Sequence, residues 1–487
     1  MLFNSIDFAI FLPIVFVLYW FVVNKNLKHQ NALIVVASYF FYGWWDWRFL
    51  SLIVFSSFVD FIVGRILSGT DDPKKRKGLL TISILVNISF LGFFKYFNFF
   101  AESFSEAFTL LGGHIEPSRL NIILPVGISF YTFQTLSYTL DVYRRKLEPT
   151  RDVVSFFAFV SFFPQLVAGP IERATNLLPQ FYKMREFDYS RATDGMRQIL
   201  WGLFKKVVIA DNAAVYANDI FQNYADYSGS TLVLGAIFFA FQIYGDFSGY
   251  SDIAIGTSRL FGFNLKQNFN FPYFSRDIAE FWRRWHISLT TWFRDYVYIP
   301  LGGSRGGIWM KIRNTFIIFI VSGFWHGANW TFLVWGFLNA LYFLPLLLLN
   351  KNRTNTDTVA EGRIMPNFKE LLQMFSTFCL TILAWIFFRA DSVDHAIRYL
   401  EKIFSPSLIK SPIKDLWAIN TGSHIIYLTV SIFVFIIIEW LQREKQHGLQ
   451  LERDKVPLYL RWSIYYILII ACFMMNGVEQ QFIYFQF

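Results

Sequence analysis

A histidine at position 326 stands inside an otherwise apolar and aromatic stretch, SGFWHGANWTFLVWG at 322–336. Ionisable side chains at membrane depth are costly and usually face a wet cavity, so this imidazole is a candidate for proton transfer in a reaction. A lone histidine is also often a hydrogen-bonded residue of a protein core. Lysine and arginine flank residues 314–349 on both sides, at positions 311, 313, 351 and 353. The chain is therefore expected to turn back within this segment, as a hairpin with His326 near its turn.

Residues 270–307 interleave aromatic side chains with arginines and are too polar to cross lipid. We interpret them as an amphipathic helix at the cytoplasmic interface. The arginines either anchor this helix to anionic lipid or receive the phosphates of a nucleotide-bearing donor substrate. The candidate donor-binding residues are Arg283, Arg284, Trp285 and Arg294.

His286 lies in the same arginine-rich segment, beside the candidate donor site. It is therefore the second histidine of interest. Its separation from His326 matches no compact spacing of metal ligands, so no metal site is predicted.

The stretch FQIYGDFSGYSDIAIG at 241–256 carries polar residues in an apolar span. Its two carboxylates either line a polar cavity or pair with Arg284 or another arginine of the interfacial segment. With a polar residue from the hairpin, the candidate cavity residues are Asp246, Ser248, Asp252 and Asn329.

The composition indicates which elements must position these side chains. The 487 residues are 54% apolar and only 16% charged, against about 25% charged in soluble domains. Long apolar runs recur along the chain, and helices are the elements that satisfy their own backbone amides in lipid. The excess of 44 basic over 35 acidic residues lies in short loops between these runs, so nucleic acid is not an expected partner.

The 20-residue rule predicts an all-α polytopic membrane protein with about eleven or twelve crossings, plus re-entrant and interfacial pieces. No separate soluble domain is visible, so 1–487 is expected to be one membrane domain, and the polar stretch 350–369 is interpreted as a linker. Basic loops after the first, third and fifth spans are expected in the cytoplasm. This places the N-terminus and the tail, 477–487, outside the cytoplasm.

Several long motifs together resemble the membrane-bound O-acyltransferases, in particular the bacterial branch that acts on polysaccharides. They cover most of the chain in the family's order: PVGISFYTFQTLSYTLDVYR at 125–144, FFPQLVAGPI at 162–171, the stretch at 241–256, FWRRWHISLTTWFRDYVYIPLGG at 281–303, and the stretch at 322–336.

The resemblance implies a ring of tilted helices around a thin central funnel. By it, His326 corresponds to the catalytic histidine and His286 to the second characteristic histidine of this branch. The tail FIYFQF, 482–487, looks like an aromatic carboxy-terminal motif of the same branch or of small companion proteins of its D-alanylating relatives. The tyrosine of that motif, Tyr484 here, is proposed to carry the acyl group as an ester. The other interpretation of this tail is an aromatic anchor at the membrane interface.

The resemblance also implies an activity. The expected enzyme is a multi-pass acetyltransferase of the bacterial inner membrane that takes acetyl groups from cytosolic acetyl-CoA for O-acetylation of an extracellular or periplasmic polysaccharide. Acetyl-CoA is a substrate here, and no resident cofactor is implied. The expected partner is a hydrolase-like acyltransferase, extracytoplasmic or membrane-anchored. The alternative is a transporter or flippase for a lipid-linked or glycan substrate, although the sequence lacks the repeated halves that many transporters show.

Overall fold

The computed structural model describes residues 1–110, 112, 120–452, 454, 456–477 and 480–483. Every regular element in these residues is a helix. Six helical stretches are long and apolar enough to cross a membrane, and two shorter apolar helices are Ile6–Val22 and Leu458–Met474. The six stretches are Leu27–Ser68, Pro73–Leu110, Gly229–Leu260, Trp330–Leu348, Phe368–Arg389 and Gly422–Leu441. The predicted all-α, multi-pass membrane fold is confirmed.

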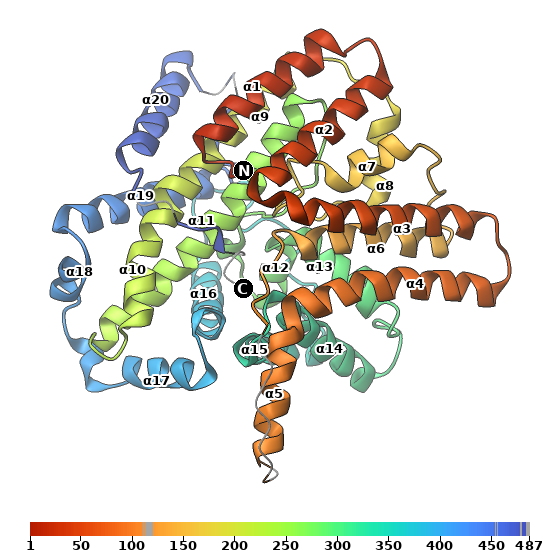
Figure 1. Cartoon of the computed structure of the whole chain (residues 1–487). Helices are drawn as coiled ribbons and strands as arrows, with labels where there is room; N and C mark the ends of the chain where they lie inside the picture. The colour runs from red at the N-terminus through yellow and green to blue at the C-terminus, as the bar shows by residue number, and fades with distance from the viewer. Residues whose placement is uncertain (111, 113–119, 453, 455, 478–479, 484–487) are drawn as a thin grey trace. The chain divides into compact units, whose positions relative to one another are not determined.

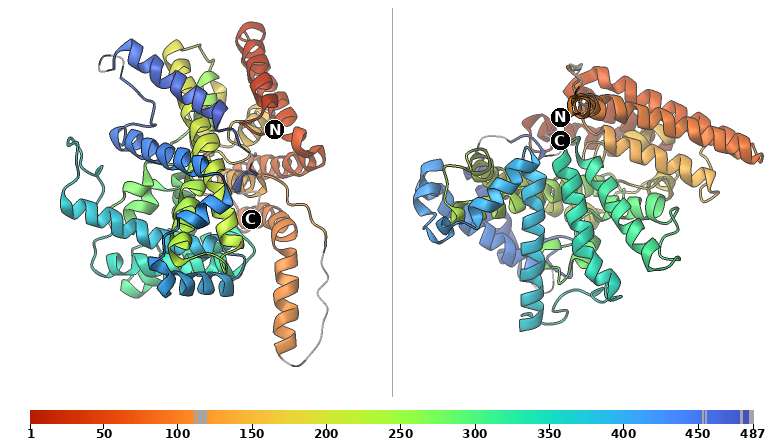
Figure 2. Two further views of the ribbon diagram at one scale, coloured as in Figure 1. Left: turned by 90° about the vertical axis from the view of Figure 1, so that its left-hand side faces the viewer. Right: turned by 90° about the horizontal axis from the view of Figure 1, so that it is seen from below.

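The chain forms two compact units, residues 1–192 with 257–266, and residues 193–256 with 267–487. Figures 1 and 2 show their helices coloured along the chain. The first unit contains α1 (Ile6–Val17), η1 (Leu18–Val22), α2 (Leu27–Asp46), η2 (Trp47–Phe49), α3 (Leu50–Ser68), α4 (Pro73–Leu91), η3 (Gly92–Tyr96), α5 (Phe97–Leu110), α6 (Ile128–Tyr143), α7 (Val153–Ser161), α8 (Ala174–Leu177) and η4 (Leu178–Tyr182).

Helices α9 (Tyr189–Leu203) and α11 (Gly229–Leu260) begin or end in the first unit and lie mostly in the second. The second unit also contains η5 (Phe204–Ala210), α10 (Asp211–Gln222), η6 (Pro272–Phe274), α12 (Ile278–Arg284), α13 (Ile287–Phe293), η7 (Arg294–Tyr298), α14 (Ile308–His326), α15 (Trp330–Leu348), α16 (Phe368–Arg389), α17 (Val393–Ile403), η8 (Pro406–Ile409), α18 (Ile413–Ile419), α19 (Gly422–Leu441) and α20 (Leu458–Met474).

A buried carboxylate holds three helices of the first unit together. Asp60 on α3 accepts hydrogen bonds from Asn87 on α4 at 2.9 Å and from Thr139 on α6 at 3.0 Å, and a third from Ser83 on α4. A buried polar group is tolerated when it is fully hydrogen-bonded. These bonds therefore account for a carboxylate among apolar helices, and they fix how α3, α4 and α6 pack (Figure 1).

In the second unit, α14 and α15 pack closely against each other as a hairpin, drawn in teal in Figures 1 and 2. A Cβ atom added to Gly323 would lie 2.2 Å from the carbonyl oxygen of Phe332, and one added to Gly336 would lie 2.4 Å from that of Phe319. Without hydrophobic driving force in lipid, helices associate closely where small residues let their backbones approach. These two glycines therefore set the geometry of the hairpin.

We predict that Gly336→Ala destabilises the protein by about 1–3 kcal/mol, because the added methyl group meets backbone rather than a movable side chain. The measurement is the thermal inactivation of the purified protein in detergent. Gly78→Ala is the matched control, since Gly78 lies in α4 and has no atom within 4 Å of an added Cβ. An alanine in a helix interior otherwise stabilises. Equal stability of the two variants would contradict the role given to Gly336.

Glycines also bring α9 and η5 against α11. A Cβ atom on Gly249 would lie 2.8 Å from the carbonyl oxygen of Gly202, and one on Gly256 would lie 2.5 Å from that of Gly195. The close contact places the lysines of η5, Lys205 and Lys206, beside the polar face of α11. It thereby determines which cations meet the carboxylates of the 241–256 stretch.

Candidate active site

His326 is the last residue of α14 and lies next to the short turn that leads into α15. Asn329 begins the second helix: its side-chain oxygen accepts a hydrogen bond from the backbone N–H of Thr331 at 3.0 Å. Its amide group also donates to the carbonyl oxygen of Asp391 at 2.9 Å. Asn329 therefore caps α15 and ties the turn to the segment after α16, and so fixes the backbone on which His326 is mounted.

The imidazole of His326 is surrounded by aromatic rings. Its centroid lies 4.8 Å from that of Trp325, 5.1 Å from that of Trp335 on α15 and 5.2 Å from that of Phe388 on α16. The latter two rings meet it edge to face, and the residue is 4% exposed. Such surroundings keep bulk water away from the imidazole, which is a condition that suits a general base.

His286 occupies a break between two short helices, α12 and α13. The backbone of His286 is left-handed, with φ of 42°. This conformation separates α12, which ends at Arg284, from α13, which begins at Ile287. The prediction of one continuous amphipathic helix over this region is therefore wrong. Most of the α12 and α13 side chains are buried, His286 itself being 1% exposed. The aromatic residues pack inward rather than lying along a surface.

The hydrogen bonds of Asn268 determine the tautomer of His286. The Asn268 oxygen accepts from the backbone N–H of Ser288 at 3.2 Å, which fixes the orientation of the amide, and it lies 3.1 Å from Nδ1 of His286. Since this oxygen can only accept, Nδ1 carries the proton. Burial lowers the pKa of His286 to about 3, so the ring is neutral at physiological pH and Nε2 is its basic atom.

The second unit brings the two histidines to the same indole. The ring centroid of Trp325 lies 6.3 Å from that of His286 and 4.8 Å from that of His326. The two histidines are 40 positions apart in the sequence: His286 lies between α12 and α13, and His326 ends α14. Asn268, which orients His286, was missed by the sequence analysis; it lies just before the arginine-rich segment and has no motif of its own.

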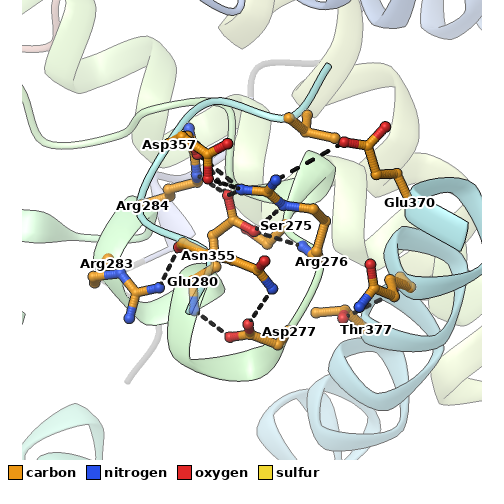
Figure 3. A network of polar contacts seen from close by, with 12 residues as sticks. Ser275, Arg276, Asp277, Glu280, Arg283, Arg284, Asn355, Asp357, Glu370 and Thr377 are labelled. Carbon is orange, nitrogen blue, oxygen red and sulfur yellow. Dashed lines mark hydrogen bonds and ion pairs between the residues drawn. The ribbon is translucent and has the colours of Figure 1, made fainter. Parts of the chain in front are cut away.

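The arginines in and just before α12 form a polar network with the segment that precedes α16 (Figure 3). Glu280 pairs with Arg276 at 3.0 Å and with Arg284 at 2.9 Å. Arg276 also contacts the Asp357 carboxylate at 3.0 Å. Arg284 is buried and donates to the Asp357 carbonyl at 3.0 Å, so its charge is balanced within the protein.

The polar stretch 350–369, predicted to be a linker, is packed against this network. Arg283 donates to the carbonyl oxygen of Asn352 at 2.9 Å. It also donates to the carbonyl oxygen of Asn355 at 2.6 Å (Figure 3). Further along, Val359 and Ala360 are buried, and Arg443 donates to both of their carbonyl oxygens. The prediction of a linker is wrong, because guanidinium groups bind the backbone of this loop in place.

The other two candidate donor-binding residues lie in different surroundings. Trp285 is buried, with its ring centroid 5.5 Å from that of Phe281 and 5.1 Å from that of Trp385. Arg294 is largely exposed and pairs with its neighbour Asp295 at 2.8 Å. Arg294 therefore presents a charged group at the surface, whereas Trp285 does not reach the surface.

The carboxylates of α11 pair with lysines. Pairing with Arg284 or another arginine of the interfacial segment, one of the two alternatives for this stretch, is therefore wrong. Asp252 pairs with Lys205 at 2.5 Å, and Asp246 pairs with Lys206 at 2.9 Å. Ser248 accepts a hydrogen bond from Lys205 at 2.9 Å. The glycine contacts between η5 and α11 explain this choice of partner.

Tyr484 lies outside the described residues. The chain just before it is described: the Phe482 ring lies 6.1 Å from that of Phe247 and 5.1 Å from that of Tyr250, both on α11. The Phe247 ring in turn lies 4.6 Å from that of His286. The C-terminal segment therefore reaches the surroundings of His286 at residue 482.

Comparison with known proteins shows which family this chain is similar to. The model of the membrane-bound O-acyltransferase family matches residues 79–387. The probable alginate O-acetylase AlgI of Pseudomonas aeruginosa is 39% identical over 408 residues, which cover 83% of this chain and 75% of that protein. The peptidoglycan O-acetyltransferase of Helicobacter pylori is 36% identical over 431 residues, 82% of this chain and 79% of that protein.

A more distant relative is the teichoic acid D-alanyltransferase of Streptococcus thermophilus, 29% identical over 60% of this chain and 75% of that protein. The family match extends through α14 and α15 and includes both histidines. With its apolar helices and its two histidines around one indole, the chain belongs to the membrane-bound O-acyltransferase family and is an O-acyltransferase.

Proposed function

We propose that this enzyme takes an acetyl group from cytosolic acetyl-CoA and passes it across the membrane for O-acetylation of a polysaccharide. The observation that carries the proposal is the pair of buried histidines that share Trp325. Two relatives are named for O-acetylation of alginate or of peptidoglycan, both built of sugars with free hydroxyl groups. A hydroxyl acceptor and a proton-accepting imidazole are the two groups that this transfer needs.

In the proposed reaction, His326 acts as the general base. It takes the proton of a hydroxyl group as the hydroxyl oxygen attacks the thioester carbonyl, and the new C–O bond replaces the C–S bond. The proton then passes to the departing sulfur, which leaves as the thiol of CoA. The basic Nε2 of neutral His286 supplies a second acceptor near the same indole. Holding both substrates in line supplies further acceleration.

The acceptor hydroxyl is assigned to Tyr484, which would carry the acetyl group as a phenol ester. A phenolate, with a pKa near 10, leaves more readily than an alkoxide, so the ester suits onward transfer. The described contacts of Phe482 with α11 support this assignment, because they bring the preceding residues near His286. A hydrolase-like acyltransferase outside the cytoplasm or anchored in the membrane would complete transfer to the polysaccharide.

The donor would approach from the cytoplasm near Arg283, Arg284, Trp285 and Arg294, with the enzyme in the bacterial inner membrane and both termini outside the cytoplasm. Arg294 is exposed and pairs only with its neighbour Asp295 among the ion pairs described, so it suits a first contact with phosphate. Arg283 reaches the donor only where phosphate replaces the loop carbonyls that it now binds.

The proposal is tested by incubating the purified protein in nanodiscs with acetyl-CoA labelled in its acetyl group. We expect label on the protein or release of free CoA at a rate well above that of the His326→Ala variant. A parallel reaction with acetylated acyl carrier protein distinguishes the two donor types. Neither label nor thioester cleavage with either donor, in protein that remains monodisperse, would refute the proposed reaction.

A further inference from the structure

Three charged side chains form a buried cluster at the junction of η5, α10 and α11, which we call the tail-binding cluster. Lys206 of η5 pairs with Asp211 of α10 at 2.7 Å and with Asp246 of α11 at 2.9 Å. All three side chains are less than a tenth exposed. Charges are kept in such surroundings only where their partners satisfy them, and in membrane proteins they usually serve a function.

The tail-binding cluster contacts the C-terminal segment through that segment's backbone. Lys206 Nζ donates to the carbonyl oxygen of Gln480 at 3.1 Å, and the backbone N–H of Ile483 donates to Asp246 at 2.7 Å. Next to the cluster, Asn212 donates to the carbonyl oxygen of Met475 at 3.0 Å. These contacts involve main-chain atoms of the tail and do not depend on its side chains.

The charges explain why a peptide backbone completes this cluster. One lysine faces two carboxylates, so an additional donor is needed for the second oxygen of Asp246. The N–H of Ile483 supplies that donor, and hydrogen bonds to a charged acceptor are stronger than bonds between neutral groups. The hydrogen bond between Ile483 and Asp246 also keeps the neighbouring Phe482, which is 2% exposed, against Phe247 and Tyr250.

We propose that Lys206 and Asp246 are positioning residues that bind the backbone of residues 480–483, and that Asp211 holds Lys206 in place for this contact. They thereby fix on α11 the chain immediately before Tyr484. Binding of the tail stands on the described contacts alone. Its effect on acetyl transfer rests on the proposed function, in which Tyr484 accepts the acetyl group.

A neighbouring ion pair provides a matched control. Lys205 lies on η5 and Asp252 on α11, the elements that carry Lys206 and Asp246 of the cluster. Lys205 and Asp252 pair at 2.5 Å and are similarly buried. Their described hydrogen bonds go to Ser248 and Gln198, and none of them reaches the described residues of the C-terminal segment. Removal of this pair should disturb the helices about as much as removal of the cluster, without releasing the tail.

Tail binding is measured by the accessibility of a cysteine at position 482. The full chain carries Phe482→Cys in a background with Cys379→Ala and Cys472→Ala, and its labelling by a membrane-impermeant maleimide is timed. Gln481→Cys, at an exposed position, gives the rate for an accessible thiol. We expect the cysteine at 482 to react at about a tenth of the rate of the cysteine at 481, or more slowly still. Equal rates at the two positions would overturn the proposal.

The most specific variant removes one backbone hydrogen-bond donor from the tail. Ile483→Pro removes the N–H that Asp246 accepts, whereas Ile483→Ala keeps it. We expect labelling at 482 to rise about tenfold in Ile483→Pro and to change little in Ile483→Ala. Asp246→Asn and Lys206→Met should also raise it, and Lys205→Met should not. Unchanged labelling in Ile483→Pro, or an equal rise in Lys205→Met, would overturn the proposal.

A double variant and the transfer assay separate the two parts of the argument. Asp246→Asn combined with Ile483→Pro should label no faster than either alone, because both remove the same contact. Additive effects would count against the contact. Acetyl transfer should fall about tenfold in Ile483→Pro and persist in Ile483→Ala. If the tail is protected in a protein that transfers no acetyl group, the proposed function fails while tail binding stands.

Discussion

Replacement of His326 with alanine should lower acetyl transfer by about 10²- to 10⁴-fold, the usual contribution of a positioned general base. The imidazole lies at the end of α14 among the rings of Trp325, Trp335 and Phe388, and the alanine side chain has no proton-accepting group. The measurement is acetylation of the polysaccharide in cells, with the membrane content of the variant determined in parallel.

His447→Ala is the matched control for this variant. His447 is also buried and contacts Asp194 through Nε2 at 3.2 Å, so its loss removes an imidazole of similar burial from the same unit. Acetylation should persist there. Normal acetylation by His326→Ala, in protein that reaches the membrane, would exclude this residue as the catalytic base.

Tyr484→Phe should reduce transfer to the level of the His326→Ala variant. The change removes one hydroxyl group and keeps the aromatic ring, so an anchoring role of the tail is preserved while the proposed ester can no longer form. The measurement is transfer of labelled acetyl to the polysaccharide by membranes that contain the variant.

The control for the tail is Tyr459→Phe, which removes a phenol from an exposed position on α20. It should leave transfer unchanged. Full transfer by Tyr484→Phe would leave only the anchoring role for the tail motif and would direct the search for the acceptor hydroxyl to the partner protein.

The sequence allowed the fold and the hairpin of α14 and α15 to be predicted because their signals are local. Apolar runs of spanning length indicate helices in lipid, and basic residues at both ends of 314–349 indicate a turn between them. The helices end and begin at His326 and Trp330, where glycine and asparagine interrupt the apolar pattern. These features need no knowledge of neighbouring segments.

The remaining features depend on contacts between distant segments. Lys205 and Lys206 were not singled out, because their pairing with Asp252 and Asp246 follows from the glycine contacts of η5 with α11. The break at His286 follows from a left-handed residue that the aromatic and basic pattern of the region does not reveal. Asn268 acquires its role only when it meets that residue.

The backbone contacts at Gly323 and Gly336 also bear on how a substrate reaches His326. Two helices whose main chains touch cannot slide past one another without a steric clash, so α14 and α15 should move as one rigid body. The gate for an incoming thioester is then expected in the side chains that surround the imidazole. Phe388, which α16 contributes, is one of these side chains, and its ring also packs against the rings of Phe332 and Trp335 on α15. Rotation of Phe388 therefore requires these aromatic rings to repack together.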